Sequence, residues 1–348
     1  MDASNPKIEL GPRAVCQRCV LPESKPDIWL DGAGICNICR DFDKQNNGHE
    51  QVKFLESDFI KILNQNKSKG KYDCLIMCSG GKDSTAALYY MKKRYKLNPL
   101  AFTFDHGFET EDALENIRNA VDILGVDFIL FKSDFMKEMF AQIVRTGSKA
   151  VLCHPCSIWY MGVTFDMAAR FDIPMIVAGW TKGQATHQPL MSRCGCNAHQ
   201  AEFVSMSKAT QAFLDQYTQE NPKYKDFPRS MEEVLTLAKK RHKAMVVSPH
   251  WFLPMDAGVY VEILKKELKW KFPRLSYPGL STNCYLNFIS VHNSMKHFGY
   301  THYHVEMSKM VRASLLSRQE ALKLLEINFD HGVLQHVMQK FDSVKGLK

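Results

Sequence analysis

The sequence predicts an α/β fold: a doubly wound parallel sheet, an N-terminal four-cysteine zinc ribbon and a helical C-terminal extension. The first observation is an apolar run at residues 72–78 that leads through a glycine turn into a helix-periodic run at 85–91. The second is the alternation of strand-like and helix-like segments that follows, which is typical of a parallel sheet with helices on both faces. The third is a pair of C-x-x-C motifs near the start of the chain.

The composition fits a protein with a substantial core, since 45% of the 348 residues are hydrophobic. The net charge of +8 suits a phosphate-rich ligand and permits a nucleic-acid partner. No signal peptide is evident, and no apolar run approaches the length of about 18 residues that a membrane span needs. We therefore expect a cytoplasmic protein without a membrane partner, whose 11 cysteines serve metal or redox chemistry. We predict three regions: a zinc-ribbon module at 1–45, a nucleotide domain at 46–190, and an insert with a helical C-terminal region at 191–348 that forms the substrate or cluster side.

The predicted zinc module depends on two cysteine pairs. Cys16 and Cys19 form the first pair, Cys36 and Cys39 form the second, and sixteen residues separate the pairs. Two such pairs can present four thiolates to one tetrahedral zinc ion, and a closed site of this kind is structural rather than catalytic. The alternative is four reduced cysteines without a metal.

The glycine turn is the predicted phosphate-binding element, and a polar linker with a predicted helix at 58–65 precedes it. Two glycines let successive backbone N–H groups converge on one anion. The following helix adds its positive end, and Lys82 adds a full charge. No G-x-x-x-x-G-K-[ST] frame fits, so this is not a Walker A loop; the alternative is a glycine turn that binds nothing. The ATP-binding candidates here are Ser79, Gly80, Gly81, Lys82, Asp83 and Ser84.

Two further residues follow predicted strands of the same sheet. Strands are predicted at 100–104, 127–131 and 174–179, and helices at 113–124, 135–146 and 158–171. The strand at 100–104 ends at Asp105, where a doubly wound sheet opens its ligand crevice, so Asp105 is a candidate ATP contact; the alternative is a turn former. Lys182, beyond the last strand, is either a phosphate contact or a solvated lysine.

The sequence S-G-G-K-D-S after a strand resembles the pyrophosphate loop of the PP-loop ATP pyrophosphatase superfamily. The resemblance implies a HUP-like PP-loop ATPase domain. Members of this superfamily cut ATP between its α and β phosphates, form an adenylated substrate and release pyrophosphate. The resemblance also implies that the strand end at Asp105 cradles the adenosine.

A second set of cysteines surrounds the predicted fourth strand. Cys153 and Cys156 form a C-x-x-C pair before the helix that leads into this strand, and Cys284 follows much later. Such a pair with one distant cysteine suits a [4Fe-4S] cluster with three thiolate ligands and one open iron. This pattern resembles the cluster-dependent tRNA thiolases of the same superfamily. Cys194 and Cys196 are rival third ligands, a zinc site using His154 or Cys196 is the other metal candidate, and reduced thiols are the alternative without a metal.

The rest of the chain is predicted to be largely helical. A charged helical insert spans 197–250, and helices follow at 259–269 and 287–298. Ser317 is the predicted N-cap of a further helix, with Glu320 at the capping-box position. The scattered histidines of this region match no specific metal site, and we expect them at the surface.

The layout as a whole resembles the N-acetyl sugar amidotransferase family of surface-polysaccharide biosynthesis. Three parts carry the resemblance, which spans residues 16–326: C-Q-R-C-V-L-P with D-G-A-G-I-C-N-I-C, the S-G-G-K-D-S loop with its strands, and F-G-Y with S-R-Q-E-A-L in the tail. It implies that an acetamido oxygen on a nucleotide sugar is adenylated, and that ammonia from a partner glutaminase converts the group to an acetamidino group. The cysteines at 153–156 and G-W-T-K-G-Q at 179–184 depart from the family pattern and favour sulfur transfer.

Both resemblances share one chemistry. Transfer of a carbonyl or amide oxygen to AMP makes it a good leaving group, after which nitrogen gives an amidine and sulfur gives a thiocarbonyl. Lys82, Asp83 and Lys182 are the catalytic candidates, with Mg²⁺ and the loop amides meeting the phosphate charge and Asp83 a candidate Mg²⁺ contact. The hypotheses are an amidotransferase, a sulfurtransferase that acts on tRNA or a small molecule with a separate sulfur donor, and a non-catalytic nucleotide-binding regulator.

Overall fold

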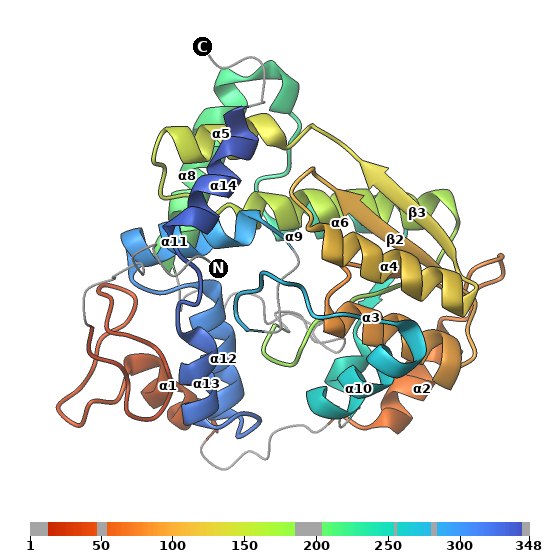
Figure 1. Cartoon of the computed structure of the whole chain (residues 1–348), viewed down its shortest axis with the longest axis horizontal. Helices are drawn as coiled ribbons and strands as arrows, with labels where there is room; N and C mark the ends of the chain where they lie inside the picture. The colour runs from red at the N-terminus through yellow and green to blue at the C-terminus, as the bar shows by residue number, and fades with distance from the viewer. Residues whose placement is uncertain (1–12, 47–53, 185–203, 254–255, 280–283, 343–348) are drawn as a thin grey trace.

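The computed structural model describes residues 13–46, 54–184, 204–253, 256–279 and 284–342 (Figure 1). Its strands are β1 (Cys74–Met77), β2 (Pro99–Asp105), β3 (Asp127–Lys132), β4 (Met175–Val177) and β5 (Met245–Val247). The helices of the N-terminal half are α1 (Asn37–Asn46), α2 (Glu56–Gln65), α3 (Lys82–Tyr89), α4 (Glu111–Leu124), α5 (Lys137–Arg145) and α6 (Cys153–Arg170). Those of the C-terminal half are α8 (Val204–Glu220), α9 (Met231–Arg241), α10 (Ala257–Leu268), α11 (Leu286–Phe298), α12 (His302–Arg312), α13 (Arg318–Leu325) and α14 (His331–Asp342).

The five strands form one parallel sheet in the order β3-β2-β1-β4-β5. The predicted α/β fold with a parallel sheet, an N-terminal four-cysteine cluster and a helical C-terminal region is therefore confirmed. Strand order reverses between β1 and β4, because the chain adds strands first on one side of β1 and then on the other. A crevice at the carboxyl ends of these strands is where such sheets bind ligands.

Both faces of the sheet are covered, as a doubly wound arrangement requires. Cys74 and Ile76 of β1 face a core shared with α2, α3, α4 and α10, whereas Leu75 and Met77 face a core shared with α5, α6 and α9. Figure 1 shows α3, α4 and α10 gathered on the first of these faces. Because successive side chains of a strand point to opposite faces, a central strand buried on both sides must be apolar throughout, as β1 is.

The sheet extends beyond residue 190, where we predicted the end of the nucleotide domain. Residues 245–247 lie in the segment predicted as a helical insert, yet they form β5 and pair with Met175–Val177 of β4. Three residues are too few to show a strand period, so the sequence pattern could not reveal this strand. The helix predicted at 158–171 begins earlier, at Cys153, which places both cysteines of the C-H-P-C stretch in its first turn.

The N-terminal module packs against the C-terminal helices, with α1 beside α12 and α13 in Figure 1. Arg318, the first residue of α13, donates hydrogen bonds from Nε and Nη2 to the carbonyl oxygen of Cys16 at 3.1 and 3.0 Å. Its Nε also donates to the carbonyl oxygen of Cys19 at 3.0 Å. Asp27 of the module accepts hydrogen bonds from Tyr300 Oη at 2.6 Å and from Ser205 Oγ at 2.9 Å. The predicted capping box of Ser317 and Glu320 at the start of α13 is present.

None of the described helices is both long enough and apolar enough to cross a membrane.

The hydrogen bonds between Arg318 and the first cysteine pair, Cys16 and Cys19, can be tested by mutation. We expect Arg318→Ala to lower the free energy of unfolding by about 1–3 kcal/mol, because it leaves two partly buried carbonyl groups without their charged donor. Urea denaturation measures this change. The rate at which zinc-loaded protein loses its metal to a chelator measures the effect on the Cys16 and Cys19 pair. The matched control is Gln319→Ala, which alters an exposed neighbour. Equal effects of the two substitutions would contradict the proposed bracing role.

Candidate active site

The glycine loop joins the carboxyl end of β1 to the start of α3, as the sequence predicts. Gly80 has a φ of +75°, and a Cβ atom there would lie 2.2 Å from the carbonyl oxygen of Ala113 in the first turn of α4. The carbonyl oxygen of Gly80 accepts hydrogen bonds from Trp270 Nε1 at 2.9 Å and from Asn116 Nδ2 at 3.3 Å. The loop is therefore fixed against α4 by a contact that only glycine permits.

Helix α3 begins just past the carboxyl end of β1, next to the end of β4. Its first N–H groups have no partner within the helix, so they can bind an anion. Ser84 Oγ accepts a hydrogen bond from the backbone N–H of Ser79 at 3.1 Å, which closes the loop on the helix. Gly179, just past β4, approaches so closely that a Cβ atom there would lie 2.4 Å from the backbone nitrogen of Ser84. The end of β4 thus lies against the predicted phosphate-binding turn.

Lys82 and Asp83 form an ion pair at this turn, with 2.6 Å between Lys82 Nζ and Asp83 Oδ2. Tyr260 donates a short hydrogen bond to Asp83 Oδ1, and the backbone oxygen of Asp83 lies 2.9 Å from His250 Nε2. Burial acts to raise the pKa of Asp83, but the Lys82 ammonium and the surrounding hydrogen bonds outweigh it and hold this pKa below its usual value. Asp83 is therefore an ionised, half-buried carboxylate beside the lysine.

Asp105 is the last residue of β2, and Lys182 lies in the turn that follows β4. Asp105 is buried at the end of β2, and its Oδ1 accepts a hydrogen bond from the backbone N–H of Gly107 at 2.7 Å. This bond is the turn-forming interaction that we gave as the alternative, and contact with the adenosine stays a prediction. Lys182 is exposed in the turn that follows β4, and its contact with phosphate also stays a prediction.

Glu306 of α12 is a buried acidic residue that the sequence analysis missed. Its Oε1 accepts a hydrogen bond from Thr181 Oγ1 at 2.8 Å, and its Oε2 accepts one from Gln184 Nε2 at 3.2 Å. Burial, helped by the charge of Asp83, raises the pKa of Glu306. Gly183 packs directly on this side chain, since a Cβ atom at Gly183 would lie 2.8 Å from Glu306 Cγ. The turn after β4 is thus held in place by α12. A contact between residues so far apart in the chain leaves no local sequence motif, so the sequence could not predict it.

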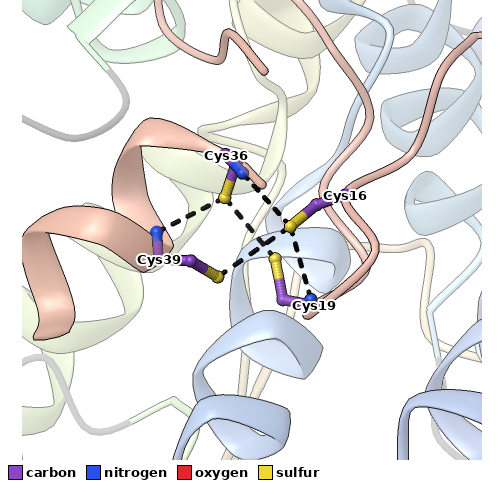
Figure 2. Close-up of side chains that lie close together, drawn as sticks. All are labelled: Cys16, Cys19, Cys36 and Cys39. Carbon is purple, nitrogen blue, oxygen red and sulfur yellow. Dashed lines mark hydrogen bonds between the residues drawn. The ribbon is translucent and has the colours of Figure 1, made fainter. Parts of the chain in front are cut away.

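The first four cysteines converge as predicted, and Figure 2 shows their sulfur atoms facing one another. All four are fully buried, and their sulfur atoms lie within 4.8 Å of one another. The Sγ atoms of Cys16 and Cys39 are 4.0 Å apart, and those of Cys19 and Cys36 are 3.7 Å apart. Zn–S bonds of about 2.3 Å in a tetrahedron place sulfurs about 3.8 Å apart. The donor set therefore fits a metal ion.

Cys153, Cys156 and Cys284 are brought to one region of the molecule. The pKa of the Cys284 thiol is raised well above its usual value by burial, then by the charges of Glu109, Cys156 and Cys153. Cys153 Sγ donates a hydrogen bond to Ser290 Oγ of α11 at 3.4 Å. The rival ligands Cys194 and Cys196 lie outside the described residues. The [4Fe-4S] cluster at these three thiols stays a prediction.

Two residues beside Cys284 were not singled out from the sequence, although D-H-G-F-E follows β2 directly. His106 Nε2 lies 3.3 Å from Glu109 Oε1 and 3.7 Å from Cys284 Sγ. Burial lowers the pKa of His106 to about 4, whereas burial and the charge of Asp105 raise the pKa of Glu109 to about 8. A neutral imidazole and a carboxyl group of high pKa thus flank the thiol.

Comparison with known proteins finds one family that matches part of the chain. Residues 73–154, from β1 to the start of α6, match the family described as queuosine biosynthesis protein QueC. The uncharacterized protein MJ1599 of Methanocaldococcus jannaschii is 24% identical over 312 residues, which cover 89% of this chain and 92% of that protein. The QueC match agrees with the predicted PP-loop superfamily and leaves the family within it open.

Three solved structures show a more general likeness. The U34-tRNA thiolase NcsA from Methanococcus maripaludis with its [4Fe-4S] cluster is 13% identical, with a TM-score of 0.35, over 96% of this chain and 89% of that one. NMN synthetase from Francisella tularensis is 12% identical, with a TM-score of 0.38, over 84% and 97%. NH3-dependent NAD synthetase from Campylobacter jejuni is 15% identical, with a TM-score of 0.30, over 63% and 95%. No functional assignment follows from likenesses of this degree.

The contact of Gly80 with α4 can be tested against a glycine of similar conformation. Gly125→Ala adds a Cβ atom at a φ of +59° with nothing within 4 Å, so it costs only backbone strain, about 1 kcal/mol. Gly80→Ala adds the collision with the Ala113 carbonyl, and we expect a loss of about 3 kcal/mol in unfolding free energy. Urea denaturation of both variants measures the difference. If the two losses were equal, the loop would not be fixed by this contact.

Proposed function

We propose that this protein is an ATP-dependent enzyme that cleaves ATP to AMP and pyrophosphate, and that it transfers AMP to a carbonyl or amide oxygen of its substrate. The observation that carries the proposal is the position of the glycine loop. The loop lies at the carboxyl end of the central strand β1, where the strand order reverses, and the start of α3 and Lys82 lie beside it. These groups are suited to the pyrophosphate part of ATP.

Different residues of the chain bind the phosphates and the Mg²⁺ ion in this proposal. The N–H groups at the start of α3 and the Lys82 ammonium bind the phosphates, and the contacts of Gly80 keep them in place. Asp83 offers a carboxylate of the kind that Mg²⁺ prefers, while Tyr260 and Lys82 orient it. Bound Mg²⁺ would neutralise phosphate charge. Lys182 is the further candidate contact for the phosphates from the turn after β4.

Nitrogen is the first candidate for the atom that replaces the activated oxygen. In this version an acetamido oxygen of a nucleotide sugar attacks the α phosphate of ATP, pyrophosphate leaves, and ammonia then displaces AMP to give an acetamidino group. A partner glutaminase supplies the ammonia. This assignment is supported by the motifs shared with the N-acetyl sugar amidotransferases, including the cysteine module, whose four-thiolate geometry suits a structural zinc ion.

Sulfur is the second candidate, and a specific observation favours it. Cys153 and Cys156 occupy the first turn of α6, and Cys153 Sγ donates a hydrogen bond to Ser290 Oγ of α11, the helix that begins just after Cys284. Three thiolates would hold a [4Fe-4S] cluster and leave one iron open for a sulfur atom. Sulfide from a donor would then displace AMP from activated tRNA or a small molecule and give a thiocarbonyl.

The adenylation proposal is tested with Lys82→Ala. Loss of the ammonium should weaken ATP binding about tenfold or more, because a charge-assisted contact contributes about 1.5–3 kcal/mol. Calorimetry measures the affinity, and chromatography identifies the nucleotide product. Lys266→Ala, an exposed lysine of α10, removes the same charge and should leave the affinity unchanged. ADP as the product, or unchanged binding in Lys82→Ala, would contradict the proposal.

The sulfur version is tested by metal analysis of anaerobically reconstituted protein. We expect roughly four iron atoms per chain and broad visible absorption in the wild type. Cys153→Ser and Cys284→Ser should lose the iron, whereas Cys74→Ala should keep it, because Cys74 lies at the opposite end of β1. A colourless wild-type protein that contains only zinc would eliminate the cluster and leave the nitrogen version.

A further inference from the structure

A carboxylate lies beside the second set of cysteines, held there by the backbone. Glu109 and Cys284 pair as an antiparallel bridge, and the N–H of Tyr285 donates to the carbonyl oxygen of Phe108 at 2.8 Å. A carboxylate oxygen of Glu109, Sγ of Cys284 and Nε2 of His106 lie within 4.8 Å of one another. The segment that follows β2 and the segment that precedes α11 thus bring three metal-binding side chains together.

The hydrogen bonds of His106 indicate that this residue is not a metal ligand. The backbone N–H of Phe108 donates to His106 Nδ1 at 3.2 Å, so this nitrogen uses its lone pair as an acceptor. A neutral imidazole then carries its proton on Nε2, which cannot bind a metal in that form. The Nε2–H group instead faces Glu109 Oε1 at 3.3 Å. His106 therefore orients the carboxylate of Glu109.

The second oxygen of that carboxylate has no visible partner. Glu109 Oε2 is buried and makes no hydrogen bond with any described residue, and the same is true of Tyr160 Oη. Tyr160 follows Cys156 by four residues on α6, so the two side chains share one face of the helix. Burial raises the pKa of Tyr160 well above its usual value, and the charges of Cys78, Glu109 and Cys156 add to this shift. Glu109 Oε2, in the residue that pairs with Cys284, is a buried polar atom that a bound ligand could satisfy.

We propose that Glu109 supplies an oxygen ligand to the open iron of the cluster held by Cys153, Cys156 and Cys284. This inference rests on the sulfur version of the proposed function. Glu109 would hold that iron through a carboxylate oxygen, which binds iron less firmly than a thiolate does, so sulfide could take its place without transfer of an electron. His106 would keep the released carboxylate beside the site.

The test is the electron paramagnetic resonance spectrum of the reduced, reconstituted protein in water labelled with a magnetic oxygen isotope. With Glu109 on the open iron, the wild-type signal should show no broadening from labelled water. Glu109→Gln should retain the iron and show the broadening, because water reaches the vacated position. Glu111→Gln removes the same charge from an exposed residue two positions away and should behave as the wild type does.

Each outcome separates this inference from the function on which it rests. Broadening in the wild type would overturn the role of Glu109 while leaving the cluster in place, whatever the variants do. An unbroadened signal in Glu109→Gln would overturn it as well. Loss of iron in Glu109→Gln, with unchanged zinc content and unfolding midpoint, would also overturn it, because the proposal has the three thiolates retain the cluster without Glu109. A wild-type protein without a cluster would end both the sulfur version and this inference.

Discussion

The close approach of Gly80 to the first turn of α4 is the contact on which both candidate sites depend. A side chain cannot fit between the loop and the Ala113 carbonyl, so the loop lies directly on the start of α4. The residues just before that helix are Glu109 and Thr110, and Thr110 is its N-cap. One short stretch of chain therefore positions the phosphate-binding turn on one side and the carboxylate beside Cys284 on the other. The separation between the glycine loop and Cys284 is set by this packing.

The cysteine module contributes to the same crevice from a distance. It is joined to α13 through Arg318 and to the start of α12 through Tyr300. Helix α12 carries Glu306, which accepts hydrogen bonds from the turn after β4. A metal ion held by the four cysteines would stabilise a series of contacts that ends at the turn after β4. Such an ion would fix the C-terminal helices on the sheet, as expected of a closed four-thiolate site.

The sequence predicted the elements with strong local patterns. The strand–turn–helix at β1 and α3, the alternation that builds the parallel sheet and the two cysteine pairs are all present. It missed β5, because three residues show no period, and it missed the early start of α6 at Cys153. Glu306 and Glu109 were missed for another reason. Their importance comes from contacts with residues far away in the chain, and neither residue belongs to a motif that composition or spacing could indicate.

The ion pair between Lys82 and Asp83 has a consequence for the choice of nucleotide. Because Asp83 already balances the lysine, the turn offers little net positive charge, and an incoming polyphosphate meets a fixed negative group. Under the proposed function, free ATP would be repelled by that carboxylate. A nucleotide that arrives with its own divalent cation would be attracted by it, since the cation can bridge the two anions. The pairing would then favour binding of the metal complex of ATP over the bare anion.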